Sequence, residues 1–206
     1  MNEKNCIDYI YSLKNDGKTI KLNGGILVPF GNKFLNDNPD CINLMNKWRI
    51  ENPQYSSSRF PISYERTYNW AKNALIEDEL RILFFIQDNS FNNIGHIGIS
   101  NFDFSRNIAS IDSAMRGVKG VCPGIMGQAI EKMKDILKNE LSAETAKAWV
   151  SSDNERSLKY SESHGFVRDT LFPMRKLEKN GEISWETDMS LGENAERYVW
   201  YMICRL

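Results

Sequence analysis

The chain has 206 residues, and its 26 Lys and Arg nearly balance its 27 Asp and Glu, giving a formal net charge of -1. That balance provides no overall attraction to nucleic acid or to an anionic membrane, so we expect neither as a partner. The length suits one folding unit. We expect a single domain over residues 1–206, with residues 1–18 as an N-terminal extension.

The N-terminus lacks the basic and apolar regions of a secretory signal, and the longest apolar run, ILFFI, is far shorter than the roughly 20 residues of a membrane span. The four cysteines are scattered, with no CxxC pair and no His at ligand spacing. We therefore expect a cytoplasmic protein with reduced thiols and without a metal site or a membrane span.

Apolar patterns and turn signals predict the elements in chain order. They are strands over 19–30, helices over 36–52 and 61–75, strands over 80–88, 92–104 and 108–115, a helix over 125–141, a strand over 145–152, a helix over 153–166, a hairpin over 170–190 and a strand over 197–206. We expect the first two helices to begin at Asn38 or Asp40 and at Ser63, and the hairpin to turn at Asn180 and Gly181. This order predicts an α+β or α/β domain with a mostly antiparallel first half and one βαβ crossover.

The segment KGVCPGIM, residues 119–126, connects a predicted strand to a predicted helix. Unpaired N–H groups and the positive end of the helix dipole make such a connection suitable for a phosphate or pyrophosphate. It is neither a Walker loop nor a GxGxxG motif. A Gly-Pro turn with a purely structural role is the alternative.

This loop and the later segment NERSLKYSESHGF together resemble the GNAT superfamily of acyl-coenzyme A dependent N-acyltransferases. The family's Gln/Arg-x-x-Gly-x-Gly/Ala loop falls on Lys119 to Gly124, and its Asn-x-x-Ala/Ser helix ending in Gly-Phe falls on Asn154 to Phe166. The resemblance implies a GNAT fold, with a central mixed, mostly antiparallel twisted sheet flanked by helices and splayed at the acetyl-CoA site. Three positions depart from the loop pattern: Lys119 replaces Gln/Arg, Cys122 replaces a residue that is often Gly, and Pro123 has no N–H. We expect Cys122 to resist a positive φ.

The resemblance also implies where acetyl-CoA binds. The backbone of the strand before the loop would pair with the pantetheine arm, the loop N–H groups would hold the pyrophosphate, and Lys119 would supply a nearby positive charge. Asn154 and Ser157 would contact the cofactor from the next helix, although Asn154, like Asp153, also suits a helix cap. The remaining implied cofactor residues are Ser113, Ala114, Met115, Gly120, Val121, Cys122, Gly124 and Ile125.

Amine acetylation requires a base for the amine proton and an acid for the departing thiolate. Asp112, His96 and Asp103 are candidate bases, because they lie on or beside the two central strands. A paired surface carboxylate and a structural histidine are the alternatives. The proton donor of many family members falls on Ser161, next to Tyr160, which a helix turns by about 100°. Ser161, water or Tyr160 would supply that proton, and Tyr160 also suits a core position.

The acceptor side resembles bacterial N-acetyltransferases of nucleotide-linked 4-amino-4,6-dideoxy sugars, with Trp-Arg-Asn followed by Ile-x-x-Glu-x-His-x-x-Trp. Trp48, Arg49 and Trp70 match this pattern, whereas Ile50 replaces the Asn and Thr67 replaces the His. We expect Trp48, Arg49 and Trp70 to bind the acceptor, and Arg49, Arg59 or Arg66 to pair with a diphosphate. Core packing is the alternative for each Trp.

The predicted function is therefore acetyl transfer to the amine of a nucleotide-linked sugar in surface polysaccharide or glycan biosynthesis. Two alternatives remain: a protein N-terminal or ribosomal-protein acetyltransferase, and a non-catalytic module that binds acyl-CoA. The apolar strand at the C-terminus is expected at a sheet edge, where it could pair with a second copy in a homodimer, and burial in the core explains its composition as well.

Overall fold

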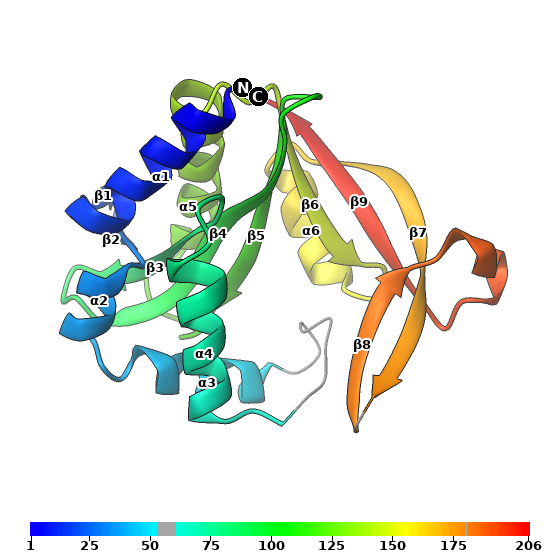
Figure 1. Ribbon diagram of the computed structural model, residues 1–206, viewed down its shortest axis with the longest axis horizontal. Helices are drawn as coiled ribbons and strands as arrows, with labels where there is room; N and C mark the ends of the chain where they lie inside the picture. Colours follow the sequence, from blue (N-terminus) through cyan, green and yellow to red (C-terminus); the bar gives the residue numbers. More distant parts are fainter. Residues whose placement is uncertain (53–60, 180) are drawn as a thin grey trace.

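The computed structural model describes residues 1–52, 61–179 and 181–206, and Figure 1 shows the arrangement of their elements. In chain order these are α1 (Glu3–Asp16), β1 (Ile20–Leu22), β2 (Gly25–Pro29), α2 (Asn32–Asp37), α3 (Cys41–Glu51), α4 (Tyr64–Ala71), π-helix η2 (Lys72–Ile76), β3 (Ile82–Asp88), β4 (Asn93–Asp103), β5 (Ile108–Arg116), α5 (Ile125–Asp135), π-helix η3 (Ile136–Glu140), β6 (Thr145–Ser151), α6 (Glu155–Ser163), β7 (Val167–Lys179), β8 (Glu182–Thr187), the 3-10 segment η4 (Met189–Asn194) and β9 (Arg197–Arg205).

The strands form one nine-stranded sheet with the order β1-β2-β3-β4-β5-β6-β9-β7-β8. Neighbouring strands are antiparallel except for β5 and β6, which are parallel and connected through α5. The predicted fold class is confirmed. The expectation of one βαβ crossover is wrong, because β6 and β7 are also parallel and are connected through α6, with β9 between them.

Two separate cores cover the two faces of the sheet. The first core contains buried residues of α1, α5 and α6, and the second contains buried residues of α2 and α3. Strand β3 contributes Phe84 to the first core and Phe85 to the second. A strand buried on both faces explains why its sequence is a continuous apolar run rather than an alternation. We call these the α5 face and the α3 face of the sheet.

The N-terminal segment is a helix that belongs to the first core. Asn2 caps α1 by accepting a hydrogen bond from the N–H of Asn5, and Cys6, Ile10 and Leu13 are buried. These three lie at positions i, i+4 and i+7, the spacing of one helical face. The residues expected to form an extension therefore pack against the sheet.

The position of β9 differs from expectation. β9 lies inside the sheet and pairs with β6 on one side and β7 on the other. The expectation that this strand lies at an edge is therefore wrong: its backbone is already paired on both sides, and it offers no free edge to a second copy.

Two helix starts were predicted with different success. The Ser63 side chain accepts a hydrogen bond from the N–H of Arg66 and caps α4, as predicted. Asp40 precedes α3 but makes no side-chain cap. Of the expected hairpin turn, Gly181 has a φ of +77°, whereas Asn180 lies outside the described residues. Across the described ranges, no helix has the length and hydropathy needed to cross a bilayer.

Candidate functional site

The sheet opens between β5 and β6. Their pairing is limited to three residue pairs at the start of each strand, and the last pair is Ser110 with Lys147. Figure 1 shows the two strands diverging from these paired ends. From Ile111 to Arg116, one edge of β5 therefore has no neighbouring strand in the described sheet. An extended molecule that carries amide groups can pair with such an edge.

A β-bulge lies in the open part of β5. His96 pairs with Met115 and Gly98 pairs with Asp112, so two residues of β5 oppose one of β4. Ser113, in this bulge, has a φ of +51°. The Nδ1–H of His96 donates to the carbonyl oxygen of Ser113 at 2.6 Å, which fixes the direction of that carbonyl.

His96 is buried between the rings of Trp48 and Phe85. Burial lowers the pKa of His96 to about 4, while the Ser113 carbonyl and the charge of Asp112 act in the opposite direction. The imidazole is therefore neutral at pH 7 and accepts a proton poorly. This environment suits a residue that positions the bulge better than a general base.

The connection from β5 to α5 has an unusual backbone. Gly120, Cys122 and Gly124 all have positive φ angles, of +78°, +48° and +79°. The expectation that Cys122 resists this conformation is wrong, since it adopts it and its thiol donates to the carbonyl oxygen of Gly24 at 3.3 Å. The guanidinium of Arg116 donates to the carbonyl oxygens of Val118, at 3.1 Å, and Val121, which holds the loop against the end of β5.

The loop and the first turn of α5 present uncommitted donors. Within the described part of the chain, the Ile125 N–H donates to Cys122, whereas several neighbouring N–H groups have no acceptor; these belong to Lys119, Gly120, Val121, Cys122, Gly124, Met126 and Gly127. A Cβ atom built at Gly120 or Gly124 would meet nothing within 4 Å, so both positions border open space. Lys119 is exposed, and Pro123 adds no donor. Such a turn at a helix N-terminus suits an anion.

Helix α6 packs beside this turn. The Asn154 side chain accepts a hydrogen bond from the N–H of Ser157 at 3.1 Å, so both residues form the cap of α6. A Cβ at Gly127 would lie 2.7 Å from the His164 ring and 3.3 Å from the Tyr160 hydroxyl. Gly127 thus lets α6 approach, and it places the Tyr160 hydroxyl at the first turn of α5. Ser161, one residue on, is half-buried.

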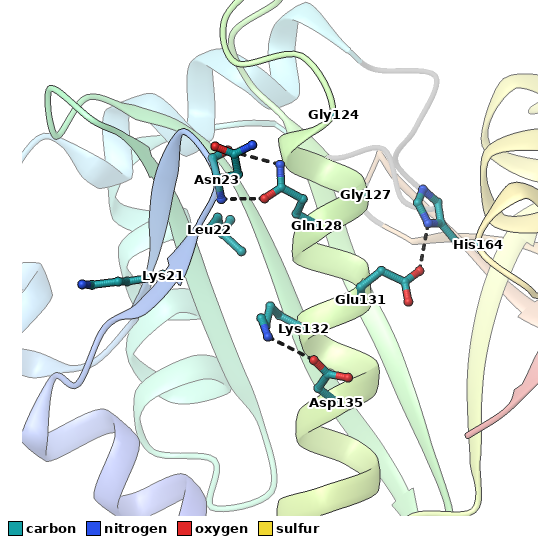
Figure 2. A pocket seen from close by; sticks show the side chains of 10 residues that line it. All are labelled: Lys21, Leu22, Asn23, Gly124, Gly127, Gln128, Glu131, Lys132, Asp135 and His164. Carbon is teal, nitrogen blue, oxygen red and sulfur yellow. Dashed lines mark hydrogen bonds and ion pairs between the residues drawn. The ribbon is translucent and has the colours of Figure 1, made fainter.

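A groove of about 550 Å³ follows the outer side of α5 (Figure 2). At one end, the N–H of Asn23 donates to Gln128 Oε1 at 2.6 Å and Gln128 Nε2 donates back to the Asn23 carbonyl, which ties the β1–β2 turn to α5. Further along the groove, Nδ1 of His164 lies 3.0 Å from Oε1 of Glu131. The groove includes Gly124 and Gly127 but no residue of β5 or β6. It therefore continues from the Gly-rich turn before α5, away from the opening in the sheet.

Asp112 lies on the α3 face of the opening. Its Oδ2 accepts hydrogen bonds from Arg81 at 2.7 Å and from the Ser100 hydroxyl at 2.6 Å. Its Oδ1 is buried, and no described group donates to it. A buried carboxylate oxygen without a donor is costly unless a ligand or water satisfies it. Arg81 was not predicted from the sequence, where it is only the first residue before a buried strand.

Asp103 lies at the opposite end of the strand pair. It accepts hydrogen bonds from the Ser105 hydroxyl and from Arg106 Nε, both at 2.6 Å. These contacts, led by Ser105, lower the pKa of Asp103 to about 2. Asp103 is therefore a turn-capping residue and a weak base.

Two of the expected acceptor residues contribute to the second core. Trp48 is 1% exposed and its ring covers Gly117, where a Cβ would lie 2.0 Å from the ring. Trp70 is half-buried against the same core. The hydroxyl of buried Thr67 donates to Asn46, so the position of the family's His joins α4 to α3 here.

The arginines of this side lie near the β7–β8 hairpin. Arg66 forms a two-pronged ion pair with Glu182 and so connects α4 to the hairpin. Burial, followed by the charge of Arg66, lowers the pKa of Arg49. Arg59 lies outside the described residues. No group of three or more His, Cys, Asp or Glu side chains suited to a metal occurs in the described ranges.

No protein-family model and no curated protein sequence matches this chain. Solved structures do. A GCN5-related N-acetyltransferase from Brucella melitensis has a TM-score of 0.69 and 13% identity, covering 93% of this chain and 80% of that chain. A chimera of the spermidine N-acetyltransferase SpeG from Vibrio cholerae and hSSAT has a TM-score of 0.61 and 18% identity, covering 89% and 96%.

SpeG from Vibrio cholerae in complex with manganese ions has a TM-score of 0.59 and 16% identity, covering 88% of this chain and 92% of that chain. At these identities the similarity establishes architecture, and it does not establish substrate. The opening between two parallel strands, the Gly-rich turn with free N–H groups before α5 and these similarities give one conclusion. The chain has the fold of the GCN5-related N-acetyltransferases.

Proposed function

We propose that the protein transfers an acetyl group from acetyl-CoA to a primary amine, that of a nucleotide-linked amino sugar. The observation that carries the proposal is the arrangement of the opening between β5 and β6. The anion-binding turn lies on its α5 face, and the carboxylate of Asp112 lies on its α3 face. A cofactor held from the first face therefore presents its reactive end to an amine arriving from the second.

The residues present fit coenzyme A. The N–H groups of the loop and of the first turn of α5 suit its pyrophosphate, and the unpaired edge of β5 suits the amides of its pantetheine arm. Ser113, Ala114 and Met115 lie on that edge, Lys119 is free to approach the phosphates, and Tyr160 reaches the same turn. When bound, acetyl-CoA would supply the thioester that donates the acetyl group.

Asp112 is the proposed base. The Asp112 side chain is 23% exposed, and its buried Oδ1 has no donor in the described structure, so the carboxylate is proposed to take the proton of the acceptor's ammonium group through one water. Arg81 and Ser100 hold Oδ2 and so orient the carboxylate. Burial raises the pKa of Tyr160, which therefore keeps its proton at neutral pH and can act as a hydrogen-bond donor on the cofactor side.

A polyamine acceptor is the second candidate, because the similar structures include spermidine N-acetyltransferases. A panel assay separates the candidates by the release of free thiol from acetyl-CoA. The panel contains a UDP-linked 4-amino-4,6-dideoxy sugar, spermidine and a peptide with a free N-terminus. We expect release with the sugar. Thiol release with spermidine alone or with the peptide alone would identify that compound's class as the acceptor in place of the sugar. Binding of acetyl-CoA without thiol release in the presence of any of the three compounds would refute catalysis.

A further inference from the structure

Three aromatic rings form a cluster on the second half of the sheet. The Trp149 ring lies 5.3 Å from the ring of Phe172 and 5.1 Å from that of Tyr201, in tilted and edge-to-face arrangements. Trp149 is 44% exposed, and the other two are half-buried. We call these three residues the aromatic platform. A large apolar surface left partly exposed on a sheet commonly marks a binding site.

Strand register places the aromatic platform on the α3 face, the face of Asp112. Directly paired residues point to the same side of a sheet, and side chains alternate along each strand. Ser110 pairs with Lys147, so Asp112 and Trp149, each two residues further on, share that side. Trp149 pairs with Tyr201. In β7, Phe172 pairs with Val199, two residues from Tyr201, and so joins the same face.

A positive charge accompanies the aromatic platform. Lys147 lies two residues before Trp149 on the same face, about 7 Å along the strand. Its ammonium makes no hydrogen bond or ion pair with any described residue. The pKa of Lys147 is lowered, mainly by burial. The negative charge of Asp103 raises this pKa, and the positive charge of Arg106 lowers it further. An ammonium that is partly removed from water and lacks a partner favours an anionic ligand.

The carboxylates near this face are largely committed. Asp103 pairs with Arg106, Asp112 with Arg81, and Glu182 with Arg66. Asp169, which lies near Tyr201, accepts a hydrogen bond from Thr170. A polycation such as spermidine would have to compete with arginines for these groups, and it would meet the charge of Lys147. A ligand with a ring and a phosphate would meet neither obstacle.

We propose that the aromatic platform and Lys147 form the acceptor subsite, where the rings contact a nucleobase or sugar ring and Lys147 pairs with a diphosphate. This inference rests on the proposed function and assigns its acceptor to residues outside the α3–α4 region. In this subsite the acceptor would lie along β6, on the same face of the sheet as Asp112 and across the opening from that residue.

Isothermal titration calorimetry with uridine and UDP-glucose tests each part separately. We expect Trp149→Leu to weaken both ligands about tenfold, because each loses a stacking contact. Lys147→Ala should weaken UDP-glucose about tenfold and leave uridine unchanged, and the effect should fade at high salt. Tyr11→Ala and Lys4→Ala, on the exposed side of α1, are the matched controls and should alter neither affinity.

Unchanged affinities in both platform variants would overturn the subsite. A change from oligomer to monomer in Trp149→Leu, with ligand affinity retained, would also overturn it and assign the rings to an interface between copies. The thiol-release assay keeps the two proposals apart. If thiol is released and Trp149→Leu leaves the KM for the acceptor unchanged, the subsite alone is refuted. UDP-glucose binding at the aromatic platform without release from any acceptor refutes the enzymatic function alone.

Discussion

Asp112 and Trp149 occupy equivalent places on opposite sides of the opening in the sheet. Each lies two residues beyond the last pair between β5 and β6, Ser110 with Lys147, and both point to the α3 face. The Gly-rich turn proposed to hold the cofactor lies on the other face, so the sheet would separate the two substrates of the proposed reaction. Acetyl transfer would then take place at the opening, and the proposed base and the proposed binding ring lie on the two strands that border it.

Removing the charge of Asp112 tests its role as a base. Asp112→Asn keeps the shape and the bond from Ser100 but cannot accept the amine proton, so we expect kcat/KM to fall by about 10²- to 10³-fold. Steady-state kinetics measure this, with thermal unfolding to confirm that the fold survives the loss of the Arg81 ion pair. Asp103→Asn is the matched control and should change kcat/KM less than threefold. Equal losses in the two variants would contradict the assignment.

The buried His96 should make stability depend on pH. Its pKa is about 4 in the folded state and 6.5 as an ordinary value, so the unfolded chain binds more protons between these limits. Stability is therefore complete above pH 6.5 and declines as pH falls toward 4. From pH 6.5 to pH 5 we expect a loss of about 1–2 kcal/mol in the free energy of unfolding.

Urea unfolding across this pH range measures the loss. In His96→Gln the side chain still donates to the Ser113 carbonyl but does not titrate, so the profile should flatten between pH 6.5 and pH 5. His164→Gln retains His96 and should retain the slope. A wild-type slope that survives in His96→Gln would show that other groups produce it.

Local patterns in the sequence predicted most of the elements and the Gly-rich turn that joins β5 to α5. Alternation in β4 and the apolar run of β3 indicated strands, and the Gly-rich segment before α5 indicated an anion site. The sequence could not give the position of β9 between β6 and β7, because chain order does not determine strand order in a sheet. The helical spacing of the apolar residues Cys6, Ile10 and Leu13 indicates helix α1, but the expectation of an N-terminal extension did not take this spacing into account.

The candidate site was harder to predict because its important contacts are long-range. Arg81 and Asp112 are 31 positions apart, and their ion pair depends on the fold. Trp48 and Trp149 both suit ligand stacking by residue type, yet Trp48 is buried while Trp149 is exposed. The difference comes from tertiary packing, because α3 places Trp48 in the second core whereas β6 leaves Trp149 at the surface. Residue type therefore predicted candidates for the chemistry, and packing determined which of these side chains are exposed.

Tyr160 and Ser161 can be distinguished by which kinetic constant changes. The Tyr160 hydroxyl lies at the first turn of α5, where the pyrophosphate is proposed to bind. We expect Tyr160→Phe to raise the KM for acetyl-CoA about fivefold through one lost hydrogen bond, with kcat changed less than threefold. Ser161→Ala is the control and should leave that KM unchanged. A large loss in kcat at constant KM would instead make Tyr160 the proton donor to the thiolate.

The strained backbone of Cys122 gives a stability test with an unusual sign. At most loop positions Ala is more stable than Gly, because Gly loses more entropy on folding. Cys122 has a φ of +48°, where a Cβ is disfavoured, and both Cys122→Ala and Cys122→Gly remove the thiol bond to Gly24. We therefore expect the Gly variant to exceed the Ala variant by about 1 kcal/mol, or about 2–4 °C in Tm. Tyr11, exposed in the middle of α1, is the control position, where the Ala variant should be more stable than the Gly variant by a similar amount. If the Ala variant at position 122 is the more stable one, the loop relaxes to a negative φ, and the uncommitted N–H groups that define the anion site would then be rearranged.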